Sequence, residues 1–295
     1  MMEEEYDNID EEKETAPEEE KEMSFLDHLE ELRWHIVRSF SVIIILAIVI
    51  FFYKEFVFNE IIFAPTNTGF WTFRMLCELG TAINIEALCF EDFPFELQSR
   101  QMMGQFMMSI TVAIVGGIII SFPYLFFEVW RFVSPGLYAN ERKISRGAVF
   151  FVSVLFLIGI SFGYFIMTPI AVNFFANYSV SEAVVNQFDI TNYVTTTVIL
   201  VFGSGTLFQL PIVTYFLAKI GLITPALMKQ YRKHAIVVIF ILGAMITPPD
   251  PFTQIFIALP LILLYQLSIM ICRSVVRKQE KQAKLDALQE TNNNE

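Results

Sequence analysis

Long apolar runs separated by short polar segments dominate the chain after residue 35. A helix rises about 1.5 Å per residue and the hydrocarbon core of a bilayer is about 30 Å thick, so a spanning helix needs about 20 apolar residues. Most of the runs have this length, and we predict a polytopic all-α membrane protein. The six predicted helices cover residues 36–53, 102–127, 147–167, 192–217, 234–247 and 254–272.

The fifth run is too short to cross a bilayer unaided. It has 14 residues before Pro248 and Pro249 stop it. That length gives about 21 Å of helix. We therefore expect neighbouring helices to shield it, or the bilayer to be thinner around it.

The connections between the runs differ in their basic residues. Lys and Arg cluster after the second, fourth and sixth runs, whereas residues 168–191 and 248–253 contain neither. Basic residues mark cytoplasmic connections, and an even number of spans places both termini on one side. Both termini are therefore predicted to be cytoplasmic. The chain also begins without the features of a signal peptide, so the first run is retained as a helix.

The net charge of −11 belongs almost entirely to the N-terminal tail. Residues 1–22 hold twelve acidic residues and two lysines, and the remainder carries about −1. The whole chain is 55% hydrophobic and 17% charged, with a mean hydropathy of +0.53. We predict a disordered acidic cytoplasmic tail at 1–22, a membrane domain at 23–275 and a polar cytoplasmic tail at 276–295. The acidic tail could compete with a cationic ligand, although we favour no role for it.

The long outward segment, residues 54–101, carries two cysteines, Cys77 and Cys89. On an oxidising face two cysteines can form a disulfide. The sequence does not show whether their Cβ atoms can meet, so a bridge and two free thiols both stay open.

Motifs for enzymatic chemistry are missing from the sequence. It has no H-E-x-x-H, no dinucleotide fingerprint and no phosphate loop, so we predict no metal, no cofactor and no nucleic-acid partner. Ser204 lies between two glycines in the fourth run, but no histidine lies deep in any run to activate it. We interpret this trio, and the pair Gly159 and Gly163, as sites of close helix packing. An intramembrane hydrolase would need a buried serine and histidine pair. A secondary transporter of a small solute, the main alternative, would need mid-membrane charge and an internal repeat.

A few polar residues remain as candidates for function. Gln209 lies inside the fourth run next to Pro211, so its amide either bonds a neighbouring helix or contacts another membrane protein. Asp27, Glu30 and Glu31 precede the first run and lie close together on a helix. They form either a solvated helix entry or a localised negative surface.

Four ordered motifs, within about residues 24–275, resemble the TatC family, the multispanning receptor subunit of the twin-arginine protein translocase. His28-Leu29-Glu30-Glu31-Leu32-Arg33 is similar to the family signature H-L-x-E-L-R. The other three matches follow in family order: Phe122-Pro123 with Trp130-Arg131-Phe132-Val133-Ser134-Pro135-Gly136-Leu137-Tyr138 and Glu141-Arg142, then Phe162-Gly163-Tyr164-Phe165 with Pro169, then Thr247-Pro248-Pro249-Asp250-Pro251-Phe252-Thr253-Gln254.

This resemblance implies a receptor and scaffold rather than an enzyme. It implies short fifth and sixth helices and an outward-facing cap loop. The family binds twin-arginine signal peptides of folded cargo at its cytoplasmic face and recruits single-span subunits of the TatA and TatB kind, driven by the proton-motive force. The expected partners also include the lipid bilayer and further copies of the chain.

The resemblance also assigns roles to individual residues. Glu31 and Glu141 are expected to contact the two arginines, and Phe132 to pack against the peptide or stack on a guanidinium. Residues expected to support this surface are His28, Leu32, Arg33, Pro135, Tyr138 and Arg142. We expect Arg33 to order the acids through an internal ion pair.

Other family positions lie elsewhere in the chain. Pro65 is expected to shape the cap loop, and Asp250 is either a helix-capping turn residue or a polar contact in translocation. Gln209 stands where the family commonly carries glutamate, and its amide can still hydrogen-bond a partner helix. His35 stands where a second basic residue is often found.

Overall fold

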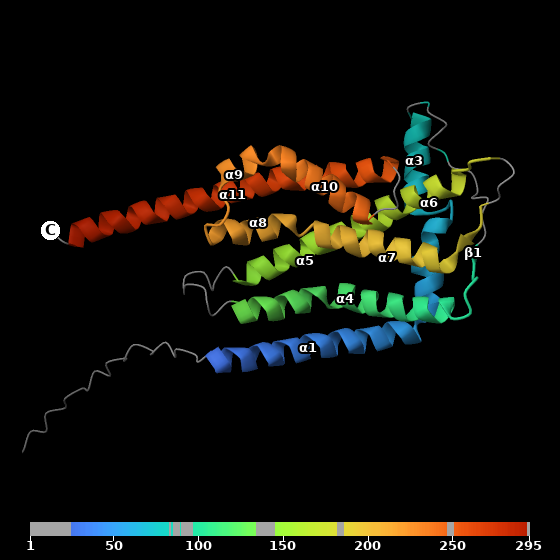
Figure 1. Ribbon diagram of the computed structural model, residues 1–295, viewed down its shortest axis with the longest axis horizontal. Helices are drawn as coiled ribbons and strands as arrows, with labels where there is room; N and C mark the ends of the chain where they lie inside the picture. The colour runs from blue at the N-terminus through green and yellow to red at the C-terminus, as the bar shows by residue number, and fades with distance from the viewer. Residues whose placement is uncertain are drawn as a thin grey trace, which may run out of the picture.

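Long helices pack side by side along one axis (Figure 1). The computed structural model describes residues 25–82, 84, 89, 97–133, 145–181, 186–246 and 251–293. The beginning of α1 and the end of α11 lie at the same end of the bundle, which we call the terminal end; the opposite one is the distal end. The principal helices are α1 (Phe25–Phe52), α4 (Gly104–Val133), α5 (Ser145–Phe162), α7 (Ile190–Leu207), α10 (Arg232–Ile246) and α11 (Pro251–Asn293).

Five segments of the described chain are long and apolar enough to span a membrane. They are Leu29–Phe52, Gly104–Phe132, Val149–Asn177, Ile190–Lys219 and Ala258–Gln289. The fifth predicted run forms α10, which follows the short α9 (Pro225–Gln230) and has only 15 residues. The short fifth helix is thus confirmed, while the total of six spans stays a prediction.

The sixth helix differs from expectation. We predicted a short helix followed by a polar tail, but α11 is 43 residues long. The prediction was wrong because the residues after Cys272 are mostly Arg, Lys, Gln, Glu, Ala and Leu, which are strong helix formers. Gln279 Nε2 also donates a hydrogen bond to the carbonyl of Lys219 (2.8 Å), which ties this polar part of α11 to a neighbouring helix.

The third and fourth runs each form more than one helix. After α5 the chain passes through a π-helical turn, η6 (Gly163–Met167), into α6 (Thr168–Asn177). The fourth run divides into α7 and α8 (Leu210–Lys219), with Pro211 in the first turn of α8. Proline is tolerated there because its missing N–H would have no intrahelical partner.

Small residues allow α5 with η6 and α7 to approach closely. A Cβ added at Gly163 would lie 2.7 Å from the carbonyl oxygen of Leu200, and one at Gly159 would lie 2.9 Å from the Cα of Gly205. A Cβ at Gly205 would in turn lie 2.6 Å from Ile160 Cδ1. The prediction of close packing through these glycines is therefore confirmed.

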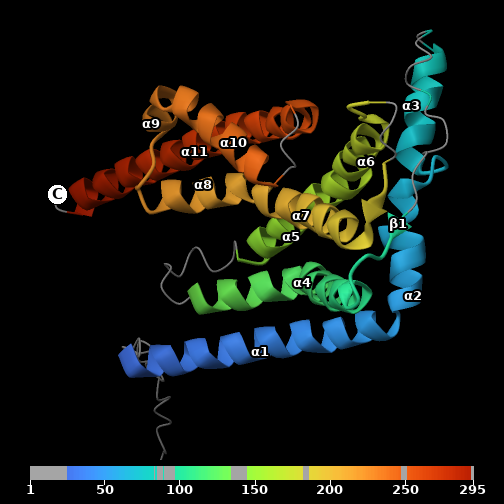
Figure 2. The same ribbon diagram turned by 45° about the vertical axis from the view of Figure 1, so that its right-hand side comes forward.

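The segment between α1 and α4 turns across the distal end, where α3 stands across the direction of the long helices (Figure 2). Tyr193 Oη donates to the carbonyl of Ile62 (2.6 Å), and Tyr164 Oη donates to that of Ile61 (2.8 Å). Pro65 is fully buried next to them. These contacts hold the segment against the bundle. Its helices are α2 (Lys54–Phe56), η1 (Val57–Ile62), η2 (Ala64–Thr66) and α3 (Trp71–Ala82).

Two covalent or backbone links complete the distal end. A disulfide joins Cys77 of α3 to Cys89, so the bridge is one of the two outcomes that the sequence left open. Strand β1 (Leu97–Gln98) pairs in parallel with β2 (Phe188–Asp189), which connects the segment before α4 to the segment before α7.

Candidate functional site

Five side chains from two helices meet toward the terminal end of the bundle. Tyr124, Glu128 and Phe132 are spaced four residues apart on α4, and Glu31 and His35 have the same spacing on α1. Residues four apart share a face of a helix. Because α1 lies along α4 (Figure 1), the two faces meet.

An imidazole and a carboxylate form the centre of this cluster. His35 Nδ1 donates to Glu128 Oε2, and Tyr124 Oη donates to Glu128 Oε1 at 2.6 Å. The other ring nitrogen of His35, Nε2, lies 3.9 Å from Glu31 Oε1. The ring of Phe132 meets the imidazole edge to face, with 6.2 Å between the ring centroids. One histidine therefore contacts two carboxylates and an aromatic ring.

Burial differs sharply within the cluster. Glu128 is 3% exposed and His35 is 6% exposed, whereas the side chain of Glu31 is 36% exposed. A buried carboxylate is costly unless it is paired and hydrogen-bonded, and Glu128 meets both conditions. Glu31 is the member of the cluster whose carboxylate can reach a ligand from solvent.

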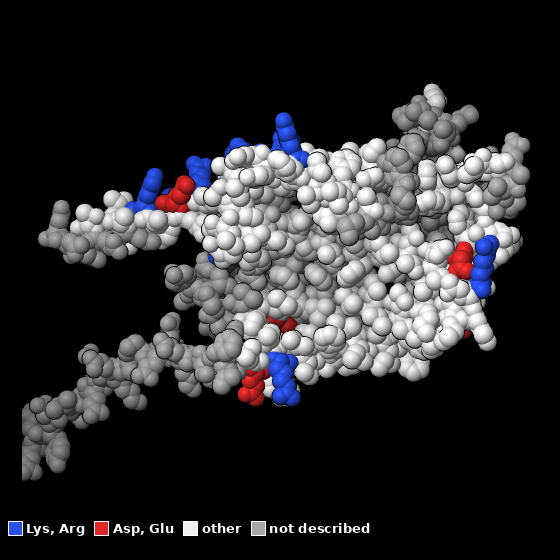
Figure 3. All heavy atoms as spheres, viewed as in Figure 1, with Lys and Arg blue, Asp and Glu red and all other residues white. Residues whose placement is uncertain are grey.

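Basic side chains also gather toward the terminal end of the bundle. Lys and Arg project along the edge that α9, α10 and α11 form toward the terminal end (Figure 3). On α4, exposed Arg131 lies between Glu128 and Phe132 in sequence. The acidic cluster and the basic edge thus belong to the same end of the bundle.

Several predicted site residues lie outside the part of the chain that the structure describes. They are Pro135, Tyr138, Glu141, Arg142 and Asp250, and for His28 only the backbone is described. The roles expected of these residues therefore stay predictions.

Two supporting residues lie on α1 within the described chain. Leu32 is half-buried and Arg33 is exposed. No ion pair joins Arg33 to another described residue. The predicted ordering role of Arg33 stays a prediction.

Gln209 lies at the break between α7 and α8. Its Nε2 donates to the carbonyl of Val152 on α5 (3.3 Å). Its Oε1 is enclosed and has no hydrogen-bond donor among the residues that the structure describes. The neighbouring helix thus satisfies the donor half of the amide, while the enclosed acceptor half has no partner among those residues.

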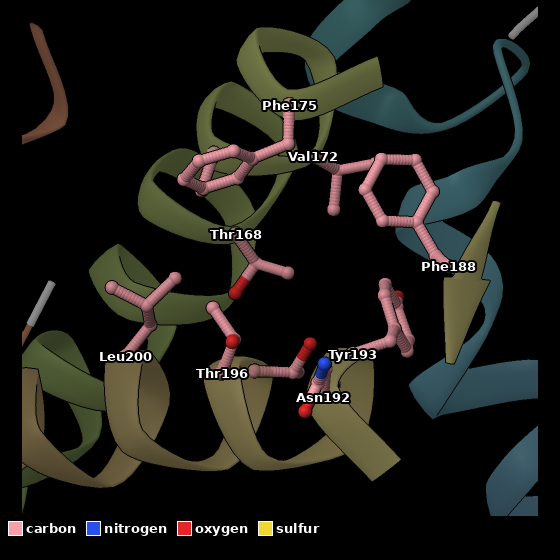
Figure 4. Close-up of a pocket in the computed structure, with 10 residues that line it drawn as sticks. Thr168, Val172, Phe175, Phe188, Asn192, Tyr193, Thr196 and Leu200 are labelled. Atoms are coloured by element: carbon pink, nitrogen blue, oxygen red, sulfur yellow. The ribbon is translucent and has the colours of Figure 1, made fainter. Parts of the chain in front are cut away.

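A cavity of about 340 Å³ opens between α6 and α7 toward the distal end (Figure 4). Apolar side chains alternate in its wall with hydroxyls and one amide, that of Asn192. Two of the hydroxyls already donate to backbone carbonyls, Thr168 to Gly163 (2.9 Å) and Tyr193 to Ile62 (2.6 Å). No carboxylate, imidazole or ammonium group lines it, so the cavity lacks the acid and base pair that hydrolysis needs.

Further observations bear on the enzymatic alternatives. Among the described residues, no group of three or more His, Cys, Asp or Glu side chains could hold a metal ion. Ser204 donates to the carbonyl of Leu200 (2.6 Å) in its own helix. Its hydroxyl thus serves the helix backbone, whereas His35 belongs to α1 and His234 to the beginning of α10.

Sequence reasoning gave Glu128 and Tyr124 no functional role. The available signal was the repeat Tyr124, Glu128, Phe132, which places a hydroxyl, a carboxylate and an aromatic ring on one face of α4. The histidine that completes the cluster is 93 residues away in sequence, so no local pattern connects it.

The fold and the site define a multi-pass α-helical membrane protein. Within the described residues, the buried pair of His35 and Glu128 lies toward the terminal end of the bundle. Residues 27–260 match the family model of TatC, the Sec-independent protein translocase protein. The chain is 40% identical over 263 residues to the TatC protein of Blattabacterium sp. subsp. Periplaneta americana, covering 88% of this chain and 99% of that protein. It is 45% identical over 169 residues to that of Helicobacter pylori (57% and 66%).

Solved structures agree with the sequence matches. Two crystal structures of the twin-arginine translocase receptor TatC, one of them in DDM, superpose with TM-scores of 0.63 and 0.65 at 28% and 29% identity. They cover 84% and 83% of this chain, and 99% and 98% of the crystallised chains. The chain belongs to the TatC family of Sec-independent protein translocase proteins, which are components of a transport machine.

Proposed function

We propose that this protein is the signal-peptide receptor of a twin-arginine translocase and exports folded proteins across the cytoplasmic membrane. One observation carries the proposal beyond family membership: α1 and α4 bring Glu31, half-exposed, and Phe132 onto one surface around His35. This surface lies at the end of the bundle where the basic residues gather. Basic residues favour the cytoplasm, so the surface faces unexported cargo.

The chemistry of the ligand matches this surface. A guanidinium donates paired hydrogen bonds to a carboxylate, and such charge-assisted bonds are stronger near a membrane, where the effective dielectric constant is lower than in water. Glu31 and Glu141 supply the two carboxylates, one for each arginine. The ring of Phe132 then contacts the peptide or stacks on one guanidinium. Lysine does not replace arginine here, because an ammonium group lacks the planar fork of donors.

The remaining parts of the proposal concern orientation and partners. Both termini are cytoplasmic and the bilayer surrounds six helices. Single-span subunits of the TatA and TatB kind bind the chain, further copies of it join the receptor complex, and the proton-motive force drives transport. Gln209, at the break between α7 and α8, is the residue that the family resemblance assigns to the contact with a partner helix.

Glu141→Ala is the central test. We expect export of twin-arginine cargo to stop while the amount of the variant in the membrane stays unchanged, because a loop carboxylate is lost without any change to a span. The matched control is Glu55→Gln, which alters an exposed acid of α2 toward the distal end. Normal export by the Glu141 variant, or equal loss in the control, would refute the assignment.

A crosslinking experiment tests the ligand itself. A photoreactive group at Phe132 should capture a twin-arginine peptide and lose it when both arginines of the peptide become lysines. Equal capture of the two peptides would show that the surface does not recognise the arginine pair.

A further inference from the structure

The packing of α1 against α4 does not by itself require the buried pair of His35 and Glu128. Helix α1 lies at the edge of the bundle, and few positions of the span Leu29–Phe52 are fully buried. Where α1 does contact α4, the approach is close and apolar: a Cβ at Gly117 would lie 2.9 Å from the carbonyl oxygen of Ile43. A well-packed apolar pair in place of a buried ion pair is often neutral or stabilising. A buried acid and imidazole at this position therefore need another explanation.

The geometry of the ring provides one. Glu128 has both oxygens engaged, Oε1 by Tyr124 and Oε2 by His35, so it holds the imidazole in one orientation. With Nδ1 fixed, Nε2 points toward Glu31, whose Oε1 is 3.9 Å away. A ring that carries hydrogen on both nitrogens is cationic, so it donates to Glu128 and attracts the carboxylate of Glu31 across 3.9 Å.

We propose that His35 is a positioning residue that holds the ligand-binding carboxylate of Glu31 beside Phe132, with Glu128 and Tyr124 as its anchor on α4. The inference rests on the proposed function, because it assumes that Glu31 contacts the signal peptide. It adds that the position of this acid is set by a second helix rather than by α1 alone. The anchored imidazole keeps Glu31 at the face that the peptide approaches, at the cost of a buried charge.

The first experiment is a double-mutant cycle on peptide affinity. The affinity of a twin-arginine peptide is measured in nanodiscs for wild type, H35Q, E31Q and the double variant. We expect each single change to weaken binding about tenfold, since E31Q removes a carboxylate that binds a guanidinium and H35Q removes the group that positions it. If His35 acts through Glu31, the double variant binds no more weakly than E31Q. Losses that multiply would show that the two residues act independently and would overturn the proposal.

Variants of Glu128 distinguish its hydrogen bond to His35 from the space that its side chain fills. E128A should weaken binding like H35Q, because the ring loses its partner. E128Q should restore most of that loss, because its amide can accept from Tyr124 and donate to the imidazole. The matched structural control is G117A, which disturbs the contact with Ile43 at a distance from the ring. In that background E31Q should keep its full effect, and a reduced effect there would contradict the proposal.

The second experiment needs no peptide. Spin labels at Trp34 and Val129, exposed by 54% and 56%, report the spacing of α1 and α4 beside the ring. We expect a narrow distance distribution that broadens in H35Q and E128A and stays narrow in E31Q. An unchanged distance distribution in H35Q would refute the proposal that His35 fixes the position of α1 against α4. If the wild type binds no peptide in an arginine-dependent manner, the proposed function fails, and the label spacing still decides whether His35 fixes α1 on α4.

Discussion

The contact of α5 and η6 with α7 is tight enough that one added methyl group should be measurable. A Cβ at Gly163 would lie 2.7 Å from the carbonyl oxygen of Leu200 and 2.8 Å from the Cα of Val201. Both are backbone atoms of another helix, so neither can move aside as a side chain would. The substitution Gly163→Ala therefore requires the two helices to separate locally.

The cost follows from that separation. Ordinary van der Waals contact begins at 3.4 Å, so the backbones must move apart by about 0.7 Å. A gap of this size forfeits about a quarter to a half of each affected dispersion contact, and overpacking of this kind costs about 1–3 kcal/mol. Alanine returns up to about 1 kcal/mol through its helix propensity. The net loss is about 1–2 kcal/mol, which lowers the melting temperature by about 2–8 °C.

Thermal unfolding of the purified protein in detergent measures this change in stability. The fraction of monomer that remains on size exclusion after heating reports the extent of unfolding. The matched control is Gly147→Ala in the preceding helix α5, where an added Cβ would meet nothing within 4 Å. We expect the control to be unchanged or slightly stabilised. A Gly163 variant as stable as wild type, or a control that falls equally, would refute the assignment of Gly163 to a close backbone contact.

Three further outcomes are expected. Cys77→Ser should lower stability by about 3 kcal/mol, because the bridge to Cys89 closes a short loop, and mass spectrometry without reductant should find neither thiol free in the wild type. Hydrogen bonds from Thr191 and from the backbone of Arg100 hold the pKa of Asp189 below its ordinary value. This carboxylate therefore stabilises the fold above about pH 4, and the stabilisation is lost as pH falls through the lowered pKa. In Asp189→Asn, melting temperatures measured between pH 3 and 6 should lack that acid-dependent loss. Gln209→Leu should change stability by less than about 1 kcal/mol and reduce crosslinking to a single-span subunit, and normal crosslinking would remove Gln209 from the partner contact.

Sequence patterns predicted those features that depend on neighbours along the chain. The apolar runs located the helices, because the bilayer thickness and the helical rise convert directly into a number of residues. Pro248 and Pro249 predicted the short α10, because proline ends a helix. The glycines of the third and fourth runs predicted close packing. The four ordered motifs led to the family that the comparisons then showed.

The same patterns did not predict the structure where one local sequence feature is compatible with two different structures. The polar residues after Cys272 were interpreted as a tail because they are hydrophilic, yet they continue α11 to Asn293 because hydrophilicity and helix propensity are separate properties. The pair Cys77 and Cys89 was left open because a bridge depends on where the backbone places two Cβ atoms.

The sequence by itself thus determined the membrane class and the approximate limits of the helices, since each depends on composition or on spacing within one segment. Only the tertiary structure placed His35 of α1 against Glu128 of α4, 93 residues further along the chain. It also decided that Glu128 is buried while Glu31 stays half-exposed. The physical reason is that burial and pairing are properties of two helices in contact, and the packing of α1 on α4 is what brings one imidazole between two carboxylates.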